Sequence, residues 1–172
     1  PAAIGWGPQL ITIYNDPFRA ILGEKPEAMG RPFTDVWSEA WDTIGPIAAA
    51  AQAGEATYIE DFPLTISRKG YPEDAYFTFC YSPLRDDEGQ IAGMLDTVVE
   101  TTERVAIERQ TRLMNSELQH RMKNMFATVN SIVSQTLRAE RPLEEIRPLL
   151  LQRISANASA HALLTETAKG DV

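Results

Sequence analysis

The chain of 172 residues contains two histidines, and one of them, His120, lies among side chains that suit nucleophilic chemistry. Arg121, Lys123 and Asn124 follow it within about one helical turn. An imidazole nitrogen without a proton is a nucleophile and can accept a phosphoryl group, provided that another molecule can approach it. Whether His120 can act in this way depends on the exposure of its ring.

Helical phase places His120 away from the apolar side of its segment. No Pro or Gly occurs between Arg104 and Arg138, which permits one continuous helix of about 35 residues. With Leu118 at 0° and about 100° per residue, His120 falls at about 200° and Asn124 at about 240°. The apolar stripe within about 60° of Leu118 consists of Met122, Met125, Val129, Ile132, Val133 and Thr136. We therefore expect His120 on an exposed strip. The ordinary alternative is a histidine packed in the core or a surface histidine without a function. The helical phase disfavours packing in the core.

The second histidine, His161, has a different phase. With Ile154 at 0°, His161 falls at about 340°, in line with Leu150 and Ala158. We expect it to be a packed core histidine that takes no direct part in chemistry.

Charge and cysteine content exclude several classes of function. Sixteen basic against 24 acidic residues give a formal charge of −8, which opposes binding to nucleic acid and anionic lipid. The single cysteine, Cys80, cannot form an internal disulfide, and no cluster of Cys or His accompanies it as a metal site. No stretch approaches the roughly 18 apolar residues of a membrane span, and Pro1 to Gly7 lacks a signal-peptide pattern. We expect a cytoplasmic location.

The composition changes near residue 100, and this change predicts two parts. Pro, Gly and aromatic residues recur before it, whereas no Gly occurs between Glu100 and Gly170. The first part reads as a mixed α/β domain over residues 1–100, and the second as long helix, with a helical linker at 101–113 and a helical hairpin at 114–172.

The expected order in the first part is one strand, short helices, then three antiparallel strands. Gly23 should end the first helix after Leu22, and Gly45-Pro46 should interrupt a second helix over 37–53. The polar hairpin connection at 85–89 should join the last two strands. The expected strands are Leu10 to Tyr14, Thr57 to Ile66, Ala75 to Leu84 and Ile91 to Val99.

This order resembles the PAS sensor fold over nearly all of residues 4–104. The segments that carry the resemblance are YNDPFRAILG, EAMGRPFTDVW, YSPLRDDEGQIAGML and the exit DTVVETTER. The resemblance implies an α+β PAS domain, built on an antiparallel sheet with short helices. Its pocket could be lined by Trp37, Phe62 and Phe79, with Trp41 and Tyr76 nearby; the ordinary alternative is that these rings only fill a core.

The resemblance also bears on cofactors. Flavin-binding light sensors of this fold carry a reactive Cys after Gly-Arg-Asn, whereas here Gly30-Arg31-Pro32 precedes Phe33. No His precedes His120, so the usual haem ligand is missing. We therefore expect neither a flavin adduct nor haem, and we expect Cys80 to be a buried or half-buried strand residue.

The segment LQHRMKNMFATVNSIVSQTLR, from Leu118 to Arg138, strongly resembles the phosphoacceptor helix of the HWE group of histidine kinases. The signature of that group is His-Arg-x-Lys-Asn. In the commoner kinase box an acidic residue follows the histidine, whereas here Arg121 does, so the general base is not identified. ISANASAHALLTET, from Ile154 to Thr167, resembles the second helix, which leaves 139–147 for the turn.

The resemblance implies that His120 accepts the γ-phosphoryl group of ATP and passes it to an Asp of a response regulator receiver domain. Lys123 and Arg121 would offset charge on the phosphoryl oxygens, and Asn124 would orient the ring; their alternative is a solvated helix face. ATP and Mg would be bound by the kinase's own separate ATP-binding domain, which we do not find in this sequence. The segment alone would therefore be inactive as a kinase.

The apolar stripes of the two helices predict a homodimer that forms a four-helix bundle from two hairpins. Two alternatives remain open at this point. A histidine phosphotransfer protein would also present an exposed His on a helical hairpin. A PAS-based dimerisation module would use the helix without phosphotransfer.

Overall fold

The computed structural model describes residues 1–138 and 141–167. They form two compact units, Pro1–Arg109 and a second that begins at Gln110. The elements in chain order are β1 (Ala2–Trp6), β2 (Ile11–Tyr14), α1 (Phe18–Leu22), α2 (Phe33–Val36), α3 (Trp41–Gln52), β3 (Thr57–Ile66), β4 (Glu73–Arg85), β5 (Ile91–Glu100), α4 (Thr102–Leu137) and α5 (Leu143–Thr167).

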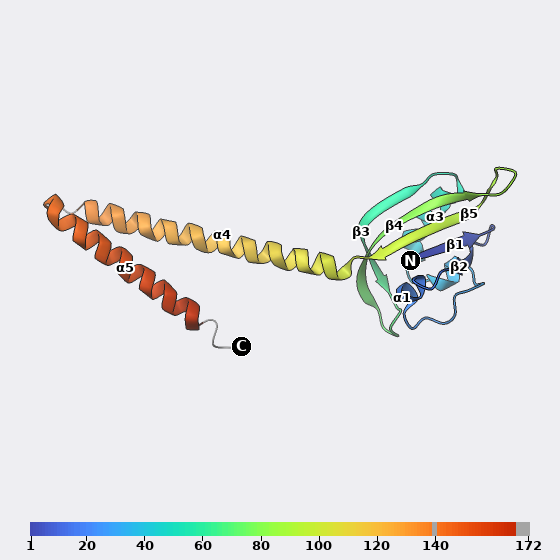
Figure 1. Ribbon diagram of the computed structural model, residues 1–172, viewed down its shortest axis with the longest axis horizontal. Coiled ribbons are helices and arrows are strands. Elements are labelled where there is room, and N and C mark those ends of the chain that lie inside the picture. Colours follow the sequence, from blue (N-terminus) through green and yellow to red (C-terminus); the bar gives the residue numbers. More distant parts are fainter. Residues whose placement is uncertain (139–140, 168–172) are drawn as a thin grey trace. The chain divides into compact units, whose positions relative to one another are not determined.

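The first unit is built on one five-stranded sheet in which every pairing is antiparallel (Figure 1). The strand order is β2-β1-β5-β4-β3, so β5, the last strand along the chain, lies in the middle of the sheet. The three predicted strands of the second half of this unit are confirmed, and Gly89, with φ of 81°, occupies the hairpin between β4 and β5. The sheet therefore holds β5 on both sides, with β4 paired from Ile91 to Glu100 and β1 from Gly93 to Thr97.

The sequence prediction missed β1. Its residues, AAIGW, contain few β-branched side chains, so the local pattern is weak. Its place in the sheet follows from pairing, because β1 lies between β2 and β5 and bonds to both. A strand of this kind is specified by its neighbours more than by its own sequence.

Alternation along β4 separates the two faces of the sheet. Phe77, Phe79 and Tyr81 are buried, whereas Thr78 and Cys80 between them are only half-buried. The buried side chains join α1, α2 and α3 in one core, and the ring centroids of Phe33 and Tyr81 lie 6.2 Å apart, edge to face. The core of the unit thus lies between the helices and the inner face of the sheet.

Helix α3 runs without interruption through Gly45 and Pro46, so the expected break there was wrong. Pro46 is the sixth residue of the helix, so α3 lacks the one backbone hydrogen bond that an N–H at this position would donate. A Cβ on Gly45 would lie 3.0 Å from the Trp41 ring, so glycine lets this indole pack against the helix one turn away. Packing therefore outweighs the low helix propensity of this pair.

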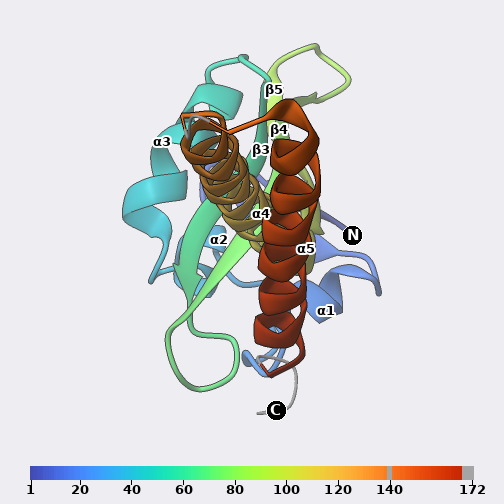
Figure 2. The same cartoon turned by 90° about the vertical axis from the view of Figure 1, so that its left-hand side faces the viewer.

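The second part of the chain is helical, as expected. The 36 residues of α4 are continuous and include His120, and α5 runs back from the far end of α4 (Figures 1 and 2). The expected turn at 139–147 was too long, because α5 begins at Leu143 and contains Pro148 in its interior. No helix among the described residues is long and apolar enough to cross a membrane.

Candidate functional site

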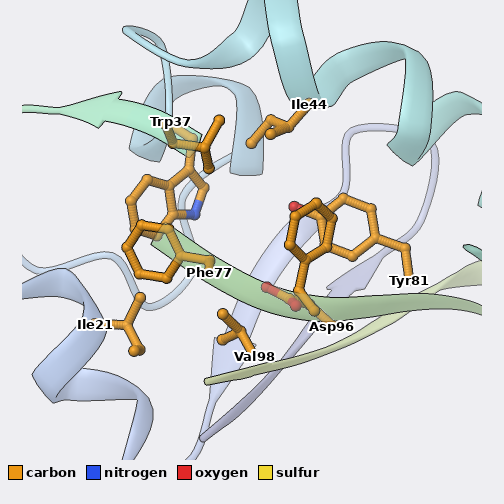
Figure 3. Close-up of a pocket in the computed structure, with 9 residues that line it drawn as sticks. Ile21, Trp37, Ile44, Phe77, Tyr81, Asp96 and Val98 are labelled. Carbon is orange, nitrogen blue, oxygen red and sulfur yellow. The ribbon is translucent and has the colours of Figure 1, made fainter. Parts of the chain in front are cut away.

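A cavity of about 30 Å³ lies between the helices and the inner face of the sheet (Figure 3). Trp37 and Phe79, two of the predicted pocket residues, belong to its wall; Phe62 does not, but its ring packs edge to face on Phe79 with centroids 5.8 Å apart. Trp41 and Tyr76 also lie outside the wall. The lining residues are Ile21, Trp37, Ile44, Leu64, Phe77, Phe79, Tyr81, Asp96 and Val98.

Asp96 is the charged group of this wall, and the sequence reasoning missed it. Its side chain is 4% exposed, and Oδ1 has no hydrogen-bond partner among the described residues. Burial raises the pKa of Asp96 to about 8, and burial, followed by the nearby Asp96, raises the pKa of Tyr81 well above its usual value. The available signal was the alternation Met94, Asp96, Val98, which places an acid on the inner face of a strand.

Trp37 is held in place by contacts with Lys25. The Lys25 ammonium lies 5.0 Å from the centre of the indole ring, donates to the carbonyl of Val36 at 2.8 Å and pairs with Glu39 at 2.5 Å. The indole Nε1 is buried and has no acceptor within the described part of the chain. Two polar atoms of opposite hydrogen-bonding character thus line one cavity without protein partners.

Cys80 is positioned by β4 on the opposite side of the sheet from the cavity. It is half-buried, as expected, and its sulfur lies 3.2 Å from the hydroxyl of Ser82. It follows Phe79, whose ring lines the cavity, and precedes Tyr81, whose ring does so too. Because side chains alternate along a strand, the thiol points away from the cavity.

The end of β5 is bound to the loop between β3 and β4 by a buried arginine. Arg68 is 6% exposed and donates to both carboxylate oxygens of Glu100 at 2.6 Å, and to Glu73 at 2.7 Å. Thr102, at the start of α4, donates to Glu100 at 3.0 Å and accepts from the backbone N–H of Tyr76 at 2.9 Å. The exit from the sheet into α4 is therefore held by side chains from three elements.

His120 lies on α4 with its ring in solvent. The amide nitrogen of Asn124, one turn later, is 3.4 Å from Nδ1 of the ring. This contact can orient the imidazole and leave Nε2 accessible. In the single chain, however, the predicted apolar stripe is also open near His120, since Leu118 is 58% and Met122 52% exposed. Burial in one chain therefore does not separate the two faces of the helix at this point.

The side chains next to His120 differ in their contacts. Lys123 is exposed. Arg121 donates to one carboxylate oxygen of Glu117, from Nη2 at 2.5 Å and from Nε at 3.1 Å, so its guanidinium is held one turn back along the helix. Glu117 was not among the predicted site residues, although the spacing of opposite charges by four residues was a signal for this pair. The predicted packing of His161 lies outside the described side chains.

Two family models match the chain, one over the cavity and one over the region of His120. The model of the PAS fold matches residues 10–106, more than half of the chain, and includes every residue of the cavity wall. The chain belongs to the PAS family. The model of the HWE histidine kinase matches residues 117–172, which contain Glu117, His120 and Asn124. The PAS domain is therefore followed by an HWE histidine kinase region.

Curated relatives of this PAS and HWE chain are longer proteins. It is 34% identical over 84 residues to blue-light-activated histidine kinase 1 of Erythrobacter litoralis, covering 47% of this chain and 23% of the relative. It is 36% identical over 76 residues to a blue-light-activated histidine kinase of Brucella anthropi, covering 44% and 16%. The chain thus spans less than a quarter of either relative.

Among solved structures, the chain is similar to an RNA-binding light-oxygen-voltage receptor. The TM-score is 0.47 at 22% sequence identity, and the match covers 70% of this chain and 34% of the other.

Proposed function

We propose that the chain is the sensing and phosphoacceptor part of a two-component sensor histidine kinase, in which His120 receives the γ-phosphoryl group of ATP. The observation that carries this proposal is the contact of Asn124 with Nδ1 of the exposed His120 ring, inside the region that matches the HWE histidine kinase. A nucleophile that must meet a nucleotide on another domain needs this exposure.

In the proposed reaction the lone pair of Nε2 of His120 attacks the γ-phosphorus. The bond from that phosphorus to the bridging oxygen breaks, and its electrons leave with ADP. Nδ1 then carries the ring proton, for which Asn124 can present its amide oxygen after rotation about its last torsion. The phosphohistidine next transfers its phosphoryl group to an Asp carboxylate of a receiver domain.

The two cations beside His120 have different roles in this proposal. Exposed Lys123 can approach the phosphoryl oxygens and offset their charge. Arg121 would have to leave Glu117 to do the same, so in the resting chain it orders the helix surface. ATP and Mg²⁺ are assigned to a nucleotide-binding domain outside residues 1–172, in keeping with the greater length of the curated relatives.

Phosphate mapping tests the assignment. The chain is incubated with ATP and an HWE kinase catalytic domain supplied in trans, and acid-labile phosphate is followed. We expect His120→Ala to abolish the label and His161→Ala to keep it. Full labelling of His120→Ala, or loss of label in His161→Ala alone, contradicts the proposal.

A second proposal concerns assembly. In the single chain the apolar stripe of α4 is more than half exposed at Leu118 and Met122, and Leu151 of α5 is 58% exposed. Burying such side chains against a second copy is favourable, and a four-helix bundle of two hairpins achieves it. Light scattering of the 172-residue chain should report a homodimer. A monomer at micromolar concentration with intact helices contradicts it.

The relatives named above are activated by blue light, and we propose a different input for this chain. The adduct chemistry of flavin light sensors needs a thiol at the flavin, but the sole cysteine, Cys80, faces away from the cavity. We propose a cytoplasmic sensor that responds to a chemical signal.

The phosphotransfer-protein alternative is not favoured, because the HWE match and the PAS domain are typical of kinases.

A further inference from the structure

The cavity of the PAS domain contains two buried polar atoms that need complementary partners. Oδ1 of Asp96 accepts a hydrogen bond when ionised, and Nε1 of Trp37 can only donate one. Both side chains are more than nine-tenths buried. Figure 3 shows the indole nitrogen and the carboxyl group facing the same space. A ligand that satisfies both must offer a donor at one end and an acceptor at the other.

The rest of the wall restricts the charge of such a ligand. Four aromatic side chains, Trp37, Phe77, Phe79 and Tyr81, contribute to it, and Asp96 is the acid among the nine lining residues. Aromatic faces attract cations, and a buried carboxylate repels anions. A desolvated ammonium group would therefore find both a counter-charge and aromatic partners here.

The size of the cavity restricts the ligand further. A polar cavity needs about 10–15 Å³ of this kind of space to hold one water molecule. The space of about 30 Å³ therefore admits only a few heavy atoms. An amino acid side chain with its backbone, a nucleotide or a ring cofactor is too large for the cavity as it stands.

We propose that this cavity binds a short primary amine bearing an oxygen atom, whose ammonium group donates to Asp96 and whose oxygen accepts from Trp37. This deepens the sensor role and rests on the proposed function for its output. Asp96 and Val98 of the wall lie on β5, which ends at the Arg68 and Glu100 pair next to α4.

The protonation of Asp96 makes binding depend on pH. With its pKa at about 8, Asp96 is protonated at neutral pH and must release its proton to pair with an ammonium group. Affinity should therefore rise about tenfold per pH unit between pH 6 and 8. The other titratable group of the wall, Tyr81, stays neutral there because its pKa is raised. Helices α1 and α3 and strand β3 contribute apolar side chains to the wall.

The test is a titration of the 172-residue chain, followed by calorimetry and by the indole N–H resonance of Trp37. The probes are 2-aminoethanol, ethylamine, ethanol and acetate. We expect 2-aminoethanol to bind most tightly and to shift the Trp37 resonance. Ethylamine should bind more weakly, and ethanol and acetate at least tenfold more weakly than 2-aminoethanol.

Two variants distinguish binding at Asp96 from the general effect of removing an acidic residue. Asp96→Asn keeps the size of the side chain and the neutral state, and should weaken 2-aminoethanol at least tenfold. The matched control Asp87→Asn removes an exposed acid from the hairpin and should change nothing. Circular dichroism and the unfolding midpoint establish that both variants fold.

Several results would overturn the proposal. They are equal binding of ethanol and 2-aminoethanol, retained binding by folded Asp96→Asn, or no shift of Trp37 with any probe, which would mean that the cavity holds water only. Binding is measured without ATP, so these outcomes leave the phosphorylation of His120 untouched. Loss of label in His120→Ala should in turn leave amine binding unchanged.

Discussion

Asp96 links the stability of the PAS domain to pH. Its buried carboxyl has a pKa of about 8, whereas an Asp in an unfolded chain has a pKa near 4. The folded state therefore holds one more proton between about pH 4 and 8, and each pH unit in this range removes about 1.4 kcal/mol of unfolding free energy at most. Above pH 8 the loss is complete, and below pH 4 it is absent.

We expect Asp96→Asn to remove this dependence. Denaturant unfolding of wild type and variant from pH 4 to 9 should show a difference that grows in favour of the variant up to about pH 8 and then levels off. Asp87→Asn, which changes an exposed acid, should follow wild type throughout. A constant difference for Asp96→Asn would mean that Asp96 is ionised in the fold at neutral pH.

The surroundings of a residue could be predicted from the sequence on helix α4 but not on strand β5. The continuity of α4 around His120 follows from local spacing, and so does the contact with Asn124 one turn away. The burial of Asp96 could not be predicted from local spacing. Its burial depends on the pairing of β5 with β1 and β4, and its partner on β1, Ala3, lies 93 positions away along the chain. The alternation of side chains along β5 indicates that Asp96 lies on the inner face of the sheet. The cavity at that face is visible only in the assembled structure.

At the scale of elements, Arg68 joins the β3–β4 loop to the end of β5. Removing it leaves Glu100 and Glu73 without their buried donor. We expect Arg68→Ala to lower the unfolding free energy by about 1–3 kcal/mol at pH 7. Arg68 lowers the pKa of Glu100, so this stabilisation is present at neutral pH and is lost as the pH falls below about 4.

Lys69→Ala is the matched control for Arg68→Ala. Lys69 also pairs with Glu73, but its side chain is about half exposed, and exposed pairs contribute little. Chemical denaturation of both variants at pH 7 and pH 3 checks the prediction. Equal losses in the two variants, or a loss for Arg68→Ala that does not shrink at pH 3, would contradict it.

Elements with strong local patterns could be predicted, and those decided by context could not. The β-branched and aromatic residues of β3, β4 and β5 are typical of strands, and the long segment without Pro or Gly is typical of a helix such as α4. β1 depends on its neighbours, and α3 continues past Gly45-Pro46 because Trp41 packs on the glycine. The start of α5 was predicted too late because Pro148 is tolerated inside the helix.

At the scale of the whole molecule, α4 begins in the PAS unit and continues into the unit that contains His120. We propose that it transmits the signal as rotation or tilt. Each residue of a helix advances the phase by about 100°, so inserting one residue between Ala106 and Arg109 should turn His120 away from its working orientation. Inserting seven residues nearly restores the phase in a coiled coil.

Autophosphorylation of the intact kinase measures this effect. We expect a one-residue insertion to abolish or lock the response to signal, and a seven-residue insertion to preserve most of it. The same response after insertions of one, three and seven residues would rule out transmission through a rigid helix, even with His120 as the phosphoacceptor.

The position of Cys80 makes the natural chain ready for spectroscopy. It is the single thiol of the sequence, and it lies half-buried on the side of β4 away from the cavity. A nitroxide or fluorophore attached there needs no cysteine-free background and does not enter the cavity. Any change in its signal when an amine is added must therefore pass through the sheet, and paired labels in a dimer would report the distance between two sensor domains.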